Sequence, residues 1–156
     1  MGIIELRKID KENFEECIGL KVTEIQDEYV ASNVYSLAQA WVSGGNAYPF
    51  AIYADGGMVG FVMMGYYAEK KIYDIWRFMI DKRFQGRGYG KEALGLAVSW
   101  LREKFDPEEI FLSFVPGNDV AERMYYKAGF RKTGEMDDDE LIMRLDCLNP
   151  PGPGMA

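Results

Sequence analysis

The glycines of one short stretch, Gln85–Lys91, have the spacing of an anion-binding loop. They stand at three alternate positions, and glycine both permits tight turns and leaves backbone N–H groups uncovered. At the start of a helix, such N–H groups and the helix dipole together favour an anion. Arg87 and Lys91 add positive charge, so we expect this stretch to bind phosphate groups.

The spacing of these glycines excludes two common nucleotide-binding motifs. A Walker phosphate loop requires glycine at the position of Gln85 and Ser or Thr at that of Glu92. The dinucleotide fingerprint G-x-G-x-x-G, begun at Gly86, requires glycine where Lys91 stands. The pattern that remains is Q/R-x-x-G-x-G/A, although glycine-rich turns before helices also occur for structural reasons alone.

A second patterned stretch, Asn118–Phe130, follows a predicted buried strand. It matches N-x-x-A-x-x-x-Y-x-x-x-G-F, with Tyr125 at the tyrosine position. The two patterns, in this order and context, resemble the two signatures of the GNAT superfamily of N-acetyltransferases. This resemblance covers nearly the whole chain, and it implies an enzyme that transfers an acetyl group from acetyl-CoA to an amine.

The resemblance also implies roles for individual residues. Tyr125 would be the acid that protonates the departing thiolate, Asn118 would bond to the coenzyme, and the backbone of Phe78–Ile80 would contact the acetyl-pantetheine. Simpler roles remain open, because Phe78–Ile80 also suits core packing and Asn118 a plain helix cap. The residues expected to bind the coenzyme are Phe78, Met79, Ile80, Gln85, Gly86, Arg87, Gly88, Tyr89, Gly90, Lys91, Asn118 and Tyr125.

A proton acceptor for the amine is harder to identify. Many GNAT enzymes have a glutamate on the strand before the glycine loop, and strand alternation would place residues 74, 76, 78 and 80 on one face. This chain has Trp76 in the middle of that face and an acid only at Asp74. Asp74 would either receive the proton through water or hold a cation at the mouth of the site.

Acids between the first two predicted helices favour a cationic acceptor. Glu24, Asp27 and Glu28 cluster beside Tyr29, a pattern that resembles bacterial spermine/spermidine acetyltransferases. Together with Asp74 they are the expected substrate contacts, although each acid alone also suits a solvated helix face. The alternatives are another acceptor (an antibiotic amine, a lysine analogue or a protein N-terminus) or an acyl-CoA-binding domain without catalysis.

Composition narrows the classes of partner and mechanism. Lys and Arg number 18 and Asp and Glu 25, and the resulting net charge of −7 argues against nucleic acid or an anionic membrane as partner. The absence of histidine excludes Ser-His and Cys-His triads and histidine-ligated metals, and we expect no metal. Neither Cys17 nor Cys147 lies in the motif region, which favours direct transfer in a ternary complex. We expect a cytoplasmic enzyme, and the resemblance implies a homodimer formed through terminal strands.

The element pattern predicts one domain over residues 1–148, followed by a disordered Pro/Gly-rich tail at 149–156. We expect a mixed α/β (α+β) fold: a mostly antiparallel sheet of six to seven strands, helices on both faces, and a central strand pair that splays apart. Asp10 should cap the first helix near Lys11, and a later helix should carry Leu37, Ala40 and Trp41 on one face. The acidic run Glu135–Glu140 is expected to form an exposed turn that attracts polyamines or closes a dimer partner's site. The strands are expected at 3–8, 50–54, 59–67, 72–80, 109–115, 131–136 and 140–146.

Overall fold

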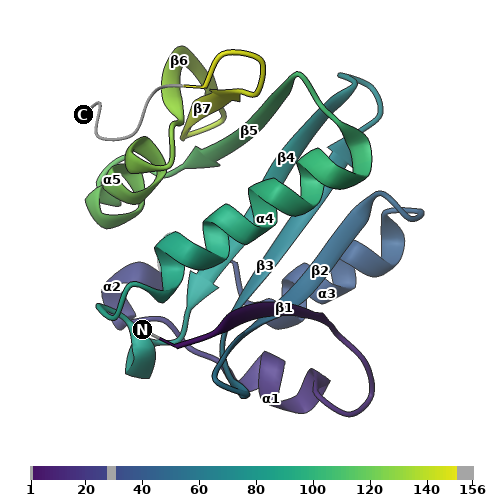
Figure 1. Ribbon diagram of the computed structural model, residues 1–156, viewed down its shortest axis with the longest axis vertical. Coiled ribbons are helices and arrows are strands. Elements are labelled where there is room, and N and C mark those ends of the chain that lie inside the picture. The colour runs from purple at the N-terminus through teal and green to yellow at the C-terminus, as the bar shows by residue number, and fades with distance from the viewer. Residues whose placement is uncertain (1, 28–30, 151–156) are drawn as a thin grey trace.

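The computed structural model of the chain describes residues 2–27 and 31–150. In this described part, seven strands form one sheet in the order β1-β2-β3-β4-β5-β7-β6. Neighbouring strands are antiparallel except β4 and β5, which run parallel at the centre of the sheet. The predicted mixed, mostly antiparallel sheet is therefore confirmed (Figure 1). The strands are β1 (Ile4–Lys8), β2 (Ala47–Ala54), β3 (Gly57–Tyr67), β4 (Ile72–Ile80), β5 (Glu109–Phe114), β6 (Arg131–Asp137) and β7 (Glu140–Asp146).

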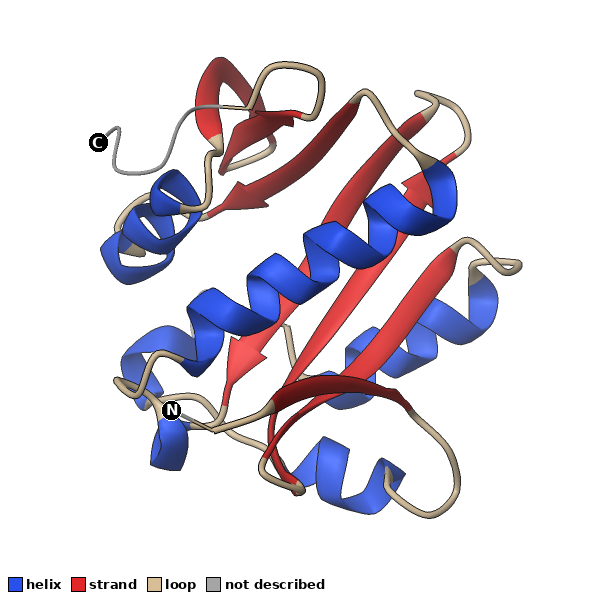
Figure 2. Ribbon diagram, viewed as in Figure 1, coloured by secondary structure: helices blue, strands red, loops and turns tan. Residues whose placement is uncertain are grey.

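Helices cover both faces of the sheet, as Figure 2 shows. One face packs against α1 and α3, and this core contains Phe61, Met63 and Met79. The other face packs against α4 and α5, where Leu94 and Tyr125 belong to the larger core. The helices are α1 (Phe14–Gly19), α2 (Glu24–Asp27), α3 (Asn33–Val42), the short 3-10 helix η1 (Lys82–Phe84), α4 (Tyr89–Phe105) and α5 (Asp119–Lys127).

The helix α4 begins directly after the glycine stretch and runs across the sheet. It buries Ala93, Leu94, Ala97 and Leu101 at helical spacing, and it ends at Phe105, with Asp106 as its C-cap just before a proline. Within residues 2–27 and 31–150, neither this helix nor any other combines the length and the apolar character needed to cross a bilayer.

Two local expectations are wrong. Asp10 does not cap a helix near Lys11, because its carboxylate accepts from the N–H groups of residues 12 and 13 in a turn, and α1 begins only at Phe14. Trp41 does not share the buried face of α3 with Leu37 and Ala40, since its side chain is 88% exposed. One residue rotates a helix by about 100°, so Trp41 lies well outside the face that Ala40 occupies.

A bulge in β4 changes which residues face which core. Met63 and Met64 of β3 pair with Arg77 and Ile75, so Trp76 is the extra residue of the bulge. The bulge reverses the alternation, because Ile75 and Phe78 both belong to the α4 side. The expected common face of residues 74, 76, 78 and 80 is therefore wrong.

The parallel strands β4 and β5 pair over a short length and then separate. Their register runs from Tyr73 opposite Ile110 to Ile75 opposite Leu112, and no further pairs follow. The backbone of β4 beyond Ile75 faces a gap rather than a neighbouring strand on this side. This is the predicted splayed pair, with Phe78–Ile80 on one edge of the gap.

Candidate active site

The glycine loop adopts the conformation that its sequence requires. Gly86 and Gly88 have φ angles of 78° and 85°, in the left-handed region that favours glycine. Gly88 is also the N-cap of α4, and Glu92 is the first residue whose N–H bonds back, to the carbonyl of Gly88. The N–H groups of the first helical turn therefore have no partner within the helix and are placed to receive an anion.

A buried carboxylate fixes the start of this loop. Asp81, only 2% exposed, accepts hydrogen bonds from the backbone N–H of Lys21 at 2.9 Å and from the Nε of Arg83 at 2.8 Å. Burial works against its charge, but the bonds from Arg83 and Lys21 hold the pKa of Asp81 below its ordinary value. Gln85 continues the anchoring, since its Nε2 donates to the carbonyl of Ile80 at 2.8 Å.

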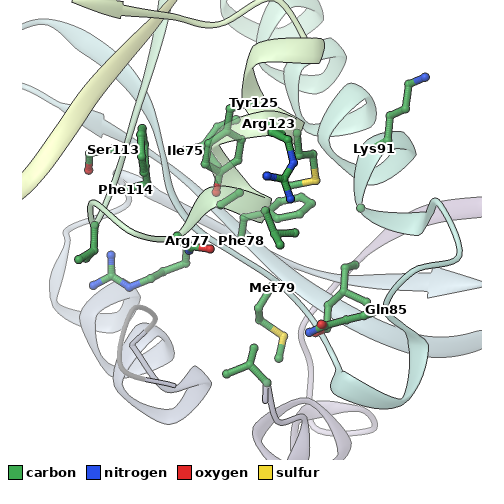
Figure 3. Close-up of a pocket in the computed structure, with 18 of the residues that line it drawn as sticks. Ile75, Arg77, Phe78, Met79, Gln85, Lys91, Ser113, Phe114, Arg123 and Tyr125 are labelled. Carbon is green, nitrogen blue, oxygen red and sulfur yellow. The ribbon is translucent and has the colours of Figure 1, made fainter. Parts of the chain in front are cut away.

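A cavity of about 920 Å³ occupies the gap between the splayed strands. Its lining includes Phe78 and Ile80 from the α4 side of the sheet and Trp76 and Met79 from the opposite side, so it reaches through the sheet. Figure 3 shows Tyr125, Phe78, Met79 and Gln85 gathered around it. Among the predicted coenzyme ligands, those that line it are Phe78, Met79, Ile80, Gln85, Gly86, Gly88, Tyr89, Gly90, Lys91, Asn118 and Tyr125.

The end of the cavity near the glycine loop is positively charged. Lys91 lines the cavity at this end, and Arg123 and Lys127 of α5 also line the cavity. Arg87, by contrast, is not among the lining residues that the structure describes; its guanidinium lies 5.6 Å from the Phe84 ring centre. Asn118 lines this end and makes no side-chain capping bond to α5, so its amide remains available for a ligand.

Tyr125 lies in the wall of the cavity on the α4 side. It packs against Phe114 and Phe130, with ring centroids 6.4 Å away in each case, and its side chain is 8% exposed. Burial, with smaller contributions from Glu140 and Asp74, raises the pKa of Tyr125 far above its ordinary value. The hydroxyl group therefore keeps its proton at neutral pH and is able to act as a donor.

The opposite end of the cavity is predominantly acidic. Glu140 and Asp139 line it together with Arg77. Burial raises the pKa of Asp74 to about 8, and the carboxylates of Glu140 and Asp137 add to this effect. Asp74 itself is not among the described lining residues, and it lies where β4 is still paired with Phe111 of β5.

The predicted acidic cluster before α3 lies only partly within the described residues. Glu24 and Asp27 belong to α2 and do not line the large cavity, although Asp27 lines a separate recess of about 50 Å³. Glu28 and Tyr29 fall outside the described residues. Val22 and Ala31, on either side of this segment, do line the large cavity, so both ends of the segment reach it.

The sequence reasoning missed several lining residues. Arg123 and Lys127 are four residues apart, and helical spacing could have placed them on one face of the motif helix. The bulge at Trp76 places Arg77 at the acidic end, and the pairing of β5 with β7 places Glu140 there. No local sequence signal predicts the bulge or the register of that pairing.

The fold and the cavity together define a class of protein, an acyl-CoA-dependent transferase. A helix N-terminus with bare N–H groups, a gap between parallel strands and a protonated tyrosine are joined in one cavity. The model of the acetyltransferase (GNAT) family matches residues 3–130, and the chain belongs to this family. It is a GNAT acetyltransferase, and acetyl-CoA is its acetyl donor.

Two kinds of relative accompany the family match. The spermine/spermidine N(1)-acetyltransferase of Bacillus subtilis (strain 168) is 33% identical over 148 residues, which cover 90% of this chain and 96% of that protein. The structure of PaiA N-acetyltransferase from Thermoplasma acidophilum in complex with coenzyme A has a TM-score of 0.69 at 20% identity, covering 92% of this chain and 99% of that chain. The structure of spermidine N-acetyltransferase from Vibrio cholerae in complex with CoA and spermine also has a TM-score of 0.69. Its sequence is 15% identical, and the match covers 90% of this chain and 92% of that chain. At such identities the two structures show the shared fold alone.

Proposed function

We propose that this acetyltransferase transfers the acetyl group of acetyl-CoA to a primary amine of a polyamine such as spermidine or spermine, directly within a ternary complex. The observation that carries the proposal is the opposite charge of the two ends of one cavity. Lys91 and Arg123 stand at one end and Glu140 and Asp139 at the other, with Tyr125 in the wall. Such a distribution suits an anionic donor at one end and a cationic acceptor at the other.

The donor end fits coenzyme A. Its pyrophosphate would meet the bare N–H groups that follow Gly88. An added Cβ at Gly90 would lie 3.0 Å from the Sδ of Met124, so Met124 would have to shift to accept a larger residue there. The unpaired edge of Phe78–Ile80 would hold the amides of the pantetheine arm, and an N–H of this edge would polarise the thioester carbonyl. Arg87 contributes its charge from outside the lining.

Tyr125 is the proposed acid for the departing thiolate. When the amine nitrogen bonds to the carbonyl carbon and the C–S bond breaks, sulfur takes the Tyr125 proton. The nitrogen then returns a proton to the phenolate oxygen, which restores the tyrosine. The high pKa of the buried Tyr125 hydroxyl ensures that this proton is present before transfer.

The acceptor is proposed to enter from the acidic end. Trp76 and Met79 line the cavity on the α3 side of the sheet, opposite the face that carries α4. We propose that Glu24, Asp27, Glu28 and Tyr29 contact the distal, still charged part of a long polycation. Asp74 lies outside the described lining and keeps its proton at neutral pH, so it adds no charge at the acidic end. The 33% identical Bacillus subtilis relative, named for spermine and spermidine, supports a polyamine as the acceptor.

The proposal is tested with a panel of acceptors and acetyl-CoA, with thiol release as the readout. Spermidine and spermine should be acetylated with higher kcat/KM than monoamines of equal length, because two or more cationic centres engage the acidic end. An aminoglycoside, a lysine analogue and a peptide with a free N-terminus represent the alternative acceptors. If one of these is preferred over every polyamine, the proposed acceptor is wrong, although the protein is still an acetyltransferase.

Three further properties belong to this proposal. We propose that residues 1–148 form one catalytic domain and that removing the tail 149–156, of which 151–156 lie outside the described residues, leaves the activity unchanged. Both cysteines are buried and free, which suits a reducing cytoplasm. Pairing of two chains through terminal strands would make the enzyme a homodimer, and light scattering on the purified protein decides this.

A further inference from the structure

Glu140 has a place in the cavity that no motif assigns. It is the first residue of β7, next to Leu141, which pairs with Phe114 at the end of β5. This is the part of β5 that has already separated from β4. Glu140 therefore lines the open part of the gap, together with Ser113, whose hydroxyl donates a hydrogen bond to the Glu140 carboxylate.

Charged groups face Glu140 from every neighbouring element. Arg77 of β4 stabilises its charge, while Asp139 and Asp137 of the β6–β7 hairpin oppose it. Asp74 of β4, Tyr125 of α5 and Tyr67 of β3 also lie within its electrostatic influence. Burial is the largest effect, and it raises the pKa of Glu140. A carboxylate in these surroundings remains basic enough to accept a proton from a bound ammonium group.

The alternative acid, Asp74, is less well placed for this step. It lies opposite Phe111, where β4 and β5 are still paired, and it is not among the described residues that line the cavity. With its pKa raised to about 8, Asp74 also holds its own proton at neutral pH. Of the two interacting carboxyl groups, Glu140 is therefore the one that lines the cavity.

We propose that Glu140, delivered by the β6–β7 hairpin, is the catalytic base that binds the acceptor ammonium group and removes its proton. This inference rests on the proposed transfer to an amine. The N–H bond breaks, its electron pair stays on nitrogen, and the proton moves to a carboxylate oxygen of Glu140. The neutral amine then attacks the thioester carbonyl carbon, and Tyr125 later donates its proton to the departing sulfur. Glu140 finally releases its proton to water, so that one proton leaves for each acetyl group transferred.

The test compares wild type, Glu140→Gln and the control Glu103→Gln over pH 7 to 9. Glu103 is an exposed acid of α4 outside the described cavity lining, and its substitution removes the same charge. Glutamine at 140 is expected to lower kcat/KM about 100-fold at pH 7. This deficit in kcat/KM should shrink about tenfold for each pH unit, because solution then supplies the neutral amine that the variant cannot make. Glu103→Gln should match wild type, and the affinity of Glu140→Gln for coenzyme A should stay within about twofold of wild type.

Two results would overturn the assignment. One is wild-type kcat/KM for Glu140→Gln at pH 7, and the other is a deficit that stays constant from pH 7 to 9, as structural damage would produce. The test uses the primary amine of the acceptor panel that the wild-type enzyme acetylates best. Failure of the polyamine proposal would thus leave the test of Glu140 intact.

Discussion

Replacing Asp74 with asparagine should remove a pH dependence of stability that this carboxyl imposes on the wild-type protein. The folded chain holds the Asp74 proton up to about pH 8, whereas an aspartate in an unfolded chain loses its proton near pH 3.8. Folding therefore takes up a proton between these two pH values. Stability from this group is fully present below the lower value and is lost as the pH rises through the upper one.

The magnitude follows from the same two pKa values. Each pH unit inside the window changes the free energy of unfolding by up to about 1.4 kcal/mol, so the upper limit between pH 5 and 8 is about 4 kcal/mol. Part of the rise in the pKa of Asp74 comes from its interaction with Glu140 and Asp137, whose own ionisation also changes with pH. Water also reaches part of the Asp74 side chain. We therefore expect a change of about 2 kcal/mol, about half the limit.

The assay is urea unfolding of wild type and Asp74→Asn at pH 5, 6, 7 and 8. Asparagine resembles the protonated acid in shape and never ionises, so the stability of the variant relative to wild type should increase steadily with pH. Glu69→Gln removes one negative charge from an exposed position before β4 and controls for the net charge of the protein. A stability difference between wild type and Asp74→Asn that does not change from pH 5 to 8 would refute the reasoning.

Two further substitutions test other parts of the account. Tyr125→Phe should lower kcat by about 100-fold with little change in the affinity for coenzyme A, measured by steady-state kinetics and titration calorimetry, and an unchanged kcat would exclude Tyr125 as the acid. Gly65→Ala should destabilise the protein by about 1–3 kcal/mol in urea unfolding, because the added Cβ would lie 2.0 Å from the Trp76 ring. Gly95→Ala, on an exposed turn of α4 with no atom within 4 Å of the added Cβ, should instead stabilise it by about 1 kcal/mol. Equal effects at the two glycines would contradict the packing described around Trp76.

Features that depend on neighbouring residues were predictable from the sequence. Glycines at alternate positions before an apolar helical pattern specify the loop at Gly86 and Gly88, because few other residues adopt the left-handed backbone found there. The spacing within the second motif predicts that Tyr125 and Tyr126 point to different sides of α5. Of these two tyrosines, Tyr125 is the one among the described residues that line the cavity. The turn at Asp55 and Gly56 also follows from local preference.

Features that depend on distant pairings were not predictable. The bulge at Trp76 is accommodated where Gly65 of β3 has no side chain, and it turns both Trp76 and Arg77 toward the α3 side. The register of β5 with β7 then brings Glu140 to the cavity from 60 residues beyond the end of β4 in the chain. Alternation counted along β4 alone could therefore not point to Glu140, the proposed base, because this residue lies on another strand.

The most direct test of the central claim varies acetyl-CoA and spermidine together in an initial-velocity experiment, with the product identified by mass spectrometry. The account predicts monoacetylspermidine and intersecting double-reciprocal lines, because donor and acceptor occupy the two ends of one cavity at the same time. Parallel lines would contradict direct transfer, and the absence of acetylated spermidine at any substrate concentration would contradict the proposed acceptor.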